Sequence, residues 1–183
     1  MVNTAVFLAE GFEEIEGLMV VDLLRRAGIT VDMVSISDSQ TVSGSHKITV
    51  TADKLIKDID FEVYDLLVLP GGMPGTIHLG ECQVLCDALV KACENGKKIA
   101  AICAAPTVFG KLGLLRVKKA CCYPDMEDGL VGAEVSFLPV TVDGNITTSR
   151  GLGTALPFAL SLIEQLMDKE TADELAKKVV YNV

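Results

Sequence analysis

The sequence predicts an α/β fold in which helices flank a mostly parallel β-sheet. Short apolar runs of strand length alternate with longer stretches whose apolar residues recur at helical spacing. Such alternation favours a parallel sheet that helices cover. The chain has 183 residues, and no linker, repeat or low-complexity tract divides it. We therefore expect residues 1–183 to form a single domain.

Turn and helix-stop residues bound the expected elements. Gly28 and Gly96 each follow a helical stretch, as glycine commonly does at helix C-termini. Asp143-Gly144-Asn145 has the composition of a hairpin turn between two strands. The expected strands are residues 3–9, 30–36, 64–69, 99–102, 118–122, 133–142 and 146–148, with short strands within 40–51. The expected helices are residues 13–27, 82–95, about 106–115, 154–167 and 169–180, with a helical turn within 53–60.

Composition narrows the class of protein. Half of the residues are hydrophobic and the mean hydropathy is +0.41, so we expect a substantial core. The formal charge of −9 disfavours nucleic acids and anionic membrane surfaces as partners. No apolar run is long enough to span a membrane, and the N-terminus turns acidic too early for a signal peptide. The six cysteines lack CxxC spacing, which indicates reduced thiols and a cytoplasmic location.

Cys103 follows a short apolar run and precedes Ala-Ala-Pro, a sequence that suits the start of a helix. The cysteine would then occupy a strand-to-helix corner, as the nucleophile does in α/β hydrolases. A helix beginning just after a cysteine favours its thiolate. The alternative is a buried cysteine that only packs.

Glu16 is the only charged residue on the apolar stripe of the first helix. The stripe also contains Met19, Val20, Leu23 and Ala27. Acidic residues stabilise a helix N-terminus, which explains Glu13 and Glu14, but Glu16 should point inward. The alternative is a side chain that bends out to solvent.

Three segments should meet at one edge of the sheet. Gly71-Gly72 follows the strand 64–69 and lets the backbone turn tightly with free N–H groups. Glu16 and Cys103 follow two other strands, and ligands of parallel sheets bind beyond the carboxyl ends of the strands. We therefore expect a carboxyl, a thiol and free amides to form one site.

Other cysteines are expected to have structural roles. His78, Cys82 and Cys86 have a helical spacing that a metal could use, but no fourth ligand is evident and a core face is favoured. Cys121 and Cys122 are neighbours, and a disulfide between them would be strained. We expect no metal and no cofactor.

The sequence resembles the ThiJ/PfpI superfamily, in the branch of the parkinsonism-associated protein deglycase. The segments that carry the resemblance are GFEEIE (11–16), VDLLRRAGI (21–29), YDLLVLPGG (64–72), AAICAAPT (100–107) and TSRGLGT (148–154). They spread over nearly the whole chain in the family's order. The resemblance implies a flavodoxin-like three-layer sandwich of the class I glutamine amidotransferase type, and a homodimer.

The resemblance also implies roles for particular residues. Cys103 would be the reactive thiol, prone to stop at sulfinate on oxidation, and Glu16 would hydrogen-bond its sulfur. The amides of Gly72 and Ala104 would bind an oxyanion, with Gly71 in support. Arg26 matches an arginine that comes near the site at the dimer interface.

The chain departs from the family's patterns at several histidines. Ala104 stands where the protease-like branches carry a histidine, and no downstream His-x-Glu exists. Tyr123 stands where deglycase-like members often have a histidine, and His46 where an arginine near the dimer interface is common. Without a histidine partner for Cys103, Glu16 would carry the proton chemistry, with help from Tyr123.

The expected function is that of a cofactor-independent cysteine enzyme. Its substrates would be reactive 2-oxoaldehydes or their protein adducts, as in a glutathione-independent glyoxalase or protein deglycase. The first alternative is a redox sensor or chaperone-like binding protein that uses a low-pKa Cys103. A peptidase or amidase is weaker, because Ala104 supplies no base.

Overall fold

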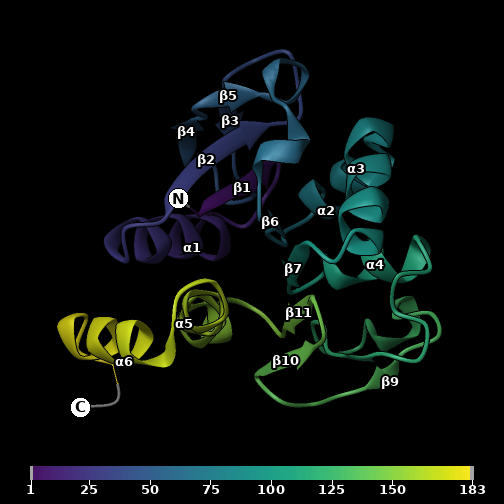
Figure 1. The fold of residues 1–183 in the computed structure, drawn as a ribbon. Helices are drawn as coiled ribbons and strands as arrows, with labels where there is room; N and C mark the ends of the chain where they lie inside the picture. Colours follow the sequence, from purple (N-terminus) through teal and green to yellow (C-terminus); the bar gives the residue numbers. More distant parts are fainter. Residues whose placement is uncertain (1, 182–183) are drawn as a thin grey trace.

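Seven strands form the central sheet of the computed structural model, which describes residues 2–181 (Figure 1). The spatial order is β10 (Val140–Asp143), β11 (Ile146–Ser149), β7 (Lys98–Ile102), β6 (Leu66–Leu69), β1 (Asn3–Leu8), β2 (Thr30–Ser35) and β5 (Lys54–Leu55). All neighbours pair in parallel except β10 with β11. The predicted mostly parallel α/β sandwich is confirmed.

The central strands are buried on both faces. All four residues of β6 are buried, as are the last five residues of β1 and the last four of β7. Strands of a parallel sheet that helices cover on both sides read as continuous apolar runs. This explains why these three strands were predictable from sequence.

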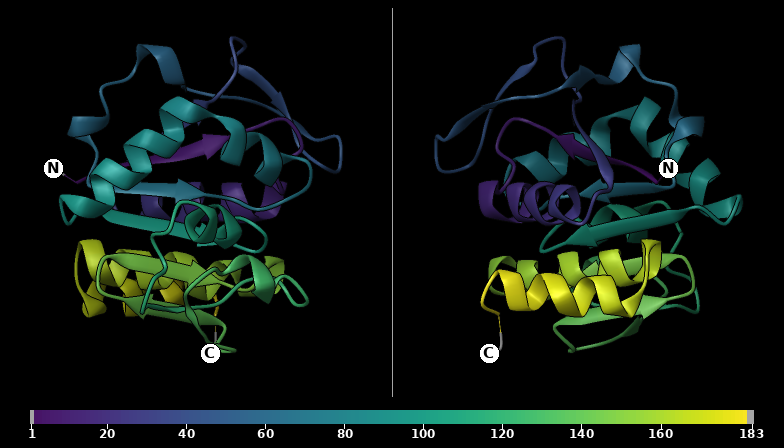
Figure 2. Two further views of the ribbon diagram at one scale, coloured as in Figure 1. Left: turned by 90° about the vertical axis from the view of Figure 1, so that its right-hand side faces the viewer. Right: turned by 60° about the vertical axis from the view of Figure 1, so that its left-hand side comes forward.

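Helices cover both faces of the sheet (Figure 2). On one face α1 (Glu14–Arg26) packs on α5 (Ala155–Leu166), which packs on α6 (Lys169–Lys178). On the other lie α2 (Gly75–Glu81), α3 (Gln83–Glu94) and α4 (Pro106–Lys111). Within residues 2–181, no helix has the length and apolar character needed to cross a membrane.

Several peripheral predictions are wrong. The helical turn expected within residues 53–60 is present as a 3₁₀ turn, Ile56–Asp58, but the strand β5 before it and the helix at residues 75–81 were not predicted. The helix after Cys103 ends at Lys111, because Gly113 turns the chain at a φ of +75°.

The expected strands 118–122 and 133–142 are also mostly irregular. Within them, β8 (Lys119–Ala120) and β9 (Glu134–Val135) form a separate parallel pair. The end of the second segment forms β10, which belongs to the central sheet. Strands β3 (Thr41–Ser43) and β4 (Thr49–Thr51) form an antiparallel hairpin outside the central sheet.

Candidate active site

Cys103 lies at the corner between β7 and α4. Its φ is +65°, an uncommon conformation for a non-glycine residue. Two later segments hold its backbone: its N–H donates to the carbonyl of Ser149 at 3.0 Å, and its carbonyl accepts from the N–H of Tyr123 at 2.8 Å. The predicted corner is therefore present, and its strained conformation is fixed from both sides.

Glu16 lies in the first turn of α1 and is only 1% exposed. Its N–H donates to Oε2 of Glu13, the N-cap residue, at 2.7 Å. Its own Oε2 accepts the N–H of Gly71 at 3.0 Å. The carboxyl is thus directed inward, as predicted, and does not bend out to solvent.

Gly71 is the point at which the two side chains converge. A Cβ built on Gly71 would lie 2.5 Å from Cβ of Cys103 and 2.6 Å from Oε2 of Glu16. Only glycine leaves room for both. The thiol of Cys103 and the carboxyl of Glu16 are therefore close enough for each to influence the pKa of the other.

Two backbone amides face the sulfur. The N–H groups of Gly72 and Ala104 lie near the Cys103 thiol and favour its ionised form. Gly72 adopts a φ of +91°, and a Cβ there would lie 2.3 Å from the nitrogen of Glu13. The structure therefore places a thiol, a carboxyl and two amide donors together, in the arrangement predicted from the three segments.

Comparison with known proteins identifies the family. Residues 2–165 match the DJ-1/PfpI family. The chain belongs to this family. It is 40% identical to Protein dj-1beta of Drosophila melanogaster, an alignment that covers 98% of each chain. It is 32% identical to the glutathione-independent glyoxalase DJR-1.2 of Caenorhabditis elegans, covering 92% of this chain and 90% of that protein.

Relatives of greater length and solved structures agree with this assignment. The chain is 41% identical to Protein DJ-1 homolog B of Arabidopsis thaliana, but covers only 40% of that protein's length. The structure of oxidized Toxoplasma gondii DJ-1 matches with a TM-score of 0.96 and 39% identity over the whole of both chains. The resemblance noted from the sequence motifs is thereby confirmed.

Burial governs the electrostatics of this DJ-1/PfpI site. It raises the pKa of Glu16 to about 7, and the charge of Glu13 acts in the same direction, while hydrogen bonds from Cys103 and Gly71 oppose it. Burial and the facing carboxyl of Glu16 also raise the pKa of Cys103 to about 12, against the amides of Ala104 and Gly72.

The sequence predicts a lowered thiol pKa, and this prediction is wrong. The helix α4 has only six residues and begins three residues after Cys103, so its dipole acts weakly on the sulfur. The adjacent carboxyl of Glu16 disfavours a second negative charge. The thiol of Cys103 therefore needs a nearby base to accept its proton before it can react as a thiolate.

A surface depression of about 400 Å³ lies beside the pair. Tyr123, Arg150 and Leu152 line it, together with Gly151. A Cβ on Gly151 would lie 3.4 Å from the ring of Tyr123 and 3.9 Å from Oε1 of Glu16, so Gly151 separates the depression from the carboxyl. Arg150 was not singled out from sequence, although it lies in a quoted family motif.

A depression of similar volume, about 410 Å³, is lined by α3 and residues 59–62 and contains none of the predicted site residues.

Two of the predicted supporting residues have different outcomes in this DJ-1/PfpI chain. Tyr123 lies at the depression with 51% exposure, and its backbone holds Cys103. Arg26 lies ten residues beyond Glu16 on α1, roughly 15 Å along the helix, and pairs with Asp22 at 2.6 Å. The contact of Arg26 with the site would require a second copy of the chain and stays a prediction.

The remaining cysteines are structural. All six are free thiols, and Cys86 is buried with its thiol directed at the carbonyls of Leu79 and Gly80. His78 instead contacts the carbonyl of Glu10 through Nδ1, at 2.9 Å. The favoured core role of Cys82 and Cys86 is consistent with the packing of Cys82 against the core cluster on the α3 side of the sheet and with the burial of Cys86.

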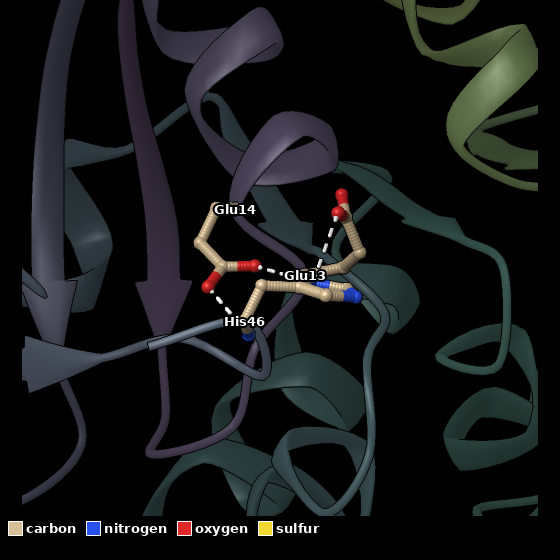
Figure 3. Close-up of side chains that lie close together, drawn as sticks. All are labelled: Glu13, Glu14 and His46. Atoms are coloured by element: carbon tan, nitrogen blue, oxygen red, sulfur yellow. Dashed lines mark hydrogen bonds and ion pairs between the residues drawn. The ribbon is translucent and has the colours of Figure 1, made fainter. Parts of the chain in front are cut away.

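A second polar cluster beside the site was not predicted. Glu13 and Glu14 are both buried, and His46 of the β3–β4 loop lies against them (Figure 3). The three closely spaced glutamates were a sequence signal, but the histidine comes from a loop about 30 residues away. Helix stabilisation alone does not explain why these carboxyls are buried.

Proposed function

We propose that this protein is a cofactor-independent glyoxalase that converts 2-oxoaldehydes into 2-hydroxy acids. The contact between the Glu16 carboxyl and the Cys103 thiol carries the proposal. A relative at 32% identity is named a glutathione-independent glyoxalase, which supports it. Small reactive carbonyls such as methylglyoxal are the proposed substrates.

The first step is addition of sulfur to the aldehyde carbon. A general base is required because the thiol of Cys103 is protonated at neutral pH. The Glu16 carboxylate accepts the thiol proton as the C–S bond forms, and that proton ends on the former aldehyde oxygen. The amides of Gly72 and Ala104 stabilise this oxygen while it is negative. The product is a hemithioacetal.

The second step moves a proton between two carbons. The Glu16 carboxylate removes the proton from the carbon bound to sulfur and returns it to the neighbouring ketone carbon, while the hydroxyl proton passes from the oxygen of the first carbon to the ketone oxygen. The first carbon is thereby oxidised to a thioester and the second reduced to an alcohol, so no external oxidant is needed. A pKa of about 7 suits a group that must both accept and donate protons.

The third step is hydrolysis. Water attacks the thioester, the C–S bond breaks, and the hydroxy acid leaves while the thiol of Cys103 is restored. For a hemithioacetal or aminocarbinol adduct on a protein, the bond from the adduct carbon to the protein sulfur or nitrogen first breaks, and the hydroxyl proton passes to the leaving thiol or amine. Cys103 then adds to the aldehyde that is released, and the same steps complete deglycation. The depression lined by Tyr123 and Arg150 offers space for the larger adduct.

Lactate release from methylglyoxal tests this function. Cys103→Ser should abolish it, and Glu16→Gln should lower kcat by about 10²–10⁴-fold, the usual value of general acid–base catalysis. Cys82→Ser, which removes a thiol distant from the site, is the matched control and should retain activity. Full lactate production by Cys103→Ser would refute the proposal.

A second candidate function, oxidation sensing, is favoured by the exposure of the site thiol. Cys103 is half-buried, as are Cys82 and Cys93, whereas Cys86, Cys121 and Cys122 are buried, so peroxide can reach the site thiol. Intact-mass analysis during peroxide titration distinguishes the two functions. The sensor would be favoured over the enzyme by two results together. Oxygen would add to the wild type but not to Cys103→Ser, and the wild type would produce no lactate from methylglyoxal.

A further inference from the structure

The loop between β3 and β4 brings a histidine to the N-terminus of α1. Nδ1 of His46 lies 3.0 Å from Oε2 of Glu14 and 3.8 Å from Oε1 of Glu13. Figure 3 shows the three side chains converging, two from the start of α1 and one from the loop. One ligating atom of each lies within 4.8 Å of the other two.

Hydrogen bonds lower the pKa of Glu14, but neither of the two buried carboxyls has a cation beside it among residues 2–181. Glu13 is 8% exposed and Glu14 is 1% exposed, and no lysine or arginine among the described residues pairs with either. His46 is the only basic side chain in contact with them, and a neutral imidazole brings no charge. A buried pair of carboxylates with no cation is costly, which points to a missing positive charge.

The hydrogen bonds leave part of this cluster available to a ligand. Oε1 of Glu14 accepts the backbone N–H groups of His46 at 2.7 Å and Ile48 at 3.3 Å, which fixes the loop. Oε2 of Glu13 accepts the N–H of Glu16. Within residues 2–181, Oε1 of Glu13 accepts no hydrogen bond and faces His46 at 3.8 Å.

We propose that Glu13, Glu14 and His46 bind a divalent transition-metal ion of the zinc class. Bonds of about 2.0–2.2 Å to one ion place two ligand atoms roughly 3.0–3.6 Å apart. The observed 3.0 and 3.8 Å from Nδ1 of His46 lie close to this range, and all three ligand atoms lie within 4.8 Å of one another, so small side-chain movements would bring them onto one ion. An imidazole with two carboxylates favours zinc over magnesium or calcium, which take oxygen ligands.

The ion would replace a proton at the histidine. Without metal, Nδ1–H of His46 can donate to Oε2 of Glu14, with the hydroxyl of Ser45 3.1 Å from the same nitrogen. On binding, Nδ1 offers its lone pair and the imidazole carries its single proton on Nε2. The His46 side chain is 70% exposed, so water can complete the coordination. This metal site does not depend on the proposed glyoxalase activity.

Calorimetric titration with Zn²⁺ in a non-coordinating buffer tests the site. The protein should carry Cys103→Ala, so that the reactive thiol cannot act as a ligand. We expect one ion per chain and a rise in the melting temperature with ion concentration. His46→Gln should weaken binding at least about 100-fold, because even outer-shell partners are worth about 10–100-fold. His78→Gln, which removes the other histidine, is the matched control and should bind as tightly as its parent.

Two further measurements test whether the ion binds at these three residues and not at a cysteine thiolate. Glu13→Gln keeps an acceptor for the N–H of Glu16 but removes a ligand charge, so it should fold normally and lose affinity. Co²⁺ should give a visible spectrum of nitrogen and oxygen ligation without a thiolate charge-transfer band. Absence of binding, unchanged binding in His46→Gln, or a thiolate band would each overturn the assignment.

Discussion

Glu13, Glu14 and Glu16 lie within four residues but have three different environments. Glu13 caps α1, Glu14 anchors the β3–β4 loop, and Glu16 contacts the thiol of Cys103. Burial opposes ionisation of Glu14, but hydrogen bonds from its own backbone and from His46 and Ile48 prevail and lower its pKa. For Glu16, burial prevails over the hydrogen bonds and raises the pKa. Donor groups nearby, and not position in the helix, decide which carboxyl keeps its proton.

The raised pKa of Glu16 predicts how stability depends on pH. Below pH 4.5 the carboxyl is protonated in the folded and unfolded chains alike. Between pH 4.5 and about 7 only the unfolded chain ionises, so the free energy of unfolding falls as pH rises. The loss should approach about 3 kcal/mol above pH 7. Glu16→Gln lacks this loss, and urea unfolding at several pH values should show the variant gaining on the wild type as pH rises.

An exposed carboxyl provides the control for this measurement. Glu81→Gln, at the end of α2, should keep a constant difference from the wild type over the same pH range. A difference between Glu16→Gln and the wild type that does not change from pH 4.5 to pH 8 would show that the Glu16 carboxyl ionises normally.

The identities of the site residues could be predicted from sequence, but their electrostatics could not. Glu16 interrupts an apolar stripe and Cys103 ends an apolar run, and both patterns are local. The pKa of each group depends on desolvation by other segments and on the contact between the two. His46 was missed for the same reason, because its contacts come from α1, far away in the sequence.

At the scale of elements, three segments at the carboxyl edge build the site. The first turn of α1, which follows β1, supplies the carboxyl, and the loops after β6 and β7 supply the Gly71-Gly72 amide and the thiol. The Gly71-Gly72 loop lies between the other two, since β6 pairs with both β1 and β7. Its backbone therefore sets the spacing between Glu16 and Cys103.

Gly71→Ala should disrupt this spacing. The added methyl group would meet Cys103, Glu16 and, at 2.9 Å, the carbonyl of Ile102. We expect about 1–3 kcal/mol of destabilisation from overpacking. We also expect about 10²-fold loss of kcat/KM for methylglyoxal, since small misplacements in catalytic sites cost that much.

Gly80→Ala is the matched control for the methyl group. Gly80 lies in α2, and its added Cβ would make an ordinary contact, 3.4 Å from Val108. It should leave stability and turnover near wild-type values. Equal activity of Gly71→Ala and Gly80→Ala would show that the site tolerates a wider separation than the geometry implies.

At the scale of the whole molecule, the sheet separates two apolar clusters. Phe109 of α4 belongs to the cluster on one face, and Phe158 of α5 to the cluster on the other. Both side chains are fully buried. Phe109→Ala and Phe158→Ala should each lower the free energy of unfolding by about 3–5 kcal/mol.

The two substitutions should have additive effects, because the residues contact opposite faces of the sheet and share no cluster. Urea unfolding measures the loss in each single variant and in the double variant. All variants should be made in a parent protein that carries a stabilising substitution, so that the double variant still folds. Strong coupling between the losses would indicate that the faces do not act independently.

The centre of the fold could be predicted and its margins could not. β1, β6 and β7 are continuous apolar runs that helices cover, and the alternation of strands with helices predicts that they pair in parallel. β5, β8 and β9 have two residues each, too few to produce a periodic pattern. The reversal of β10 depends on pairing with β11, which the sequence signalled only through the turn at Gly144.

The backbone of Cys103 is held by Ser149 and Tyr123, both of which follow it in the chain. During synthesis, the ribosome delivers the cysteine well before either anchor. A nascent chain that has not yet extended past residue 149 lacks these two hydrogen bonds, so nothing from the later segments maintains the left-handed corner. The corner that holds Cys103 is therefore completed only late in translation.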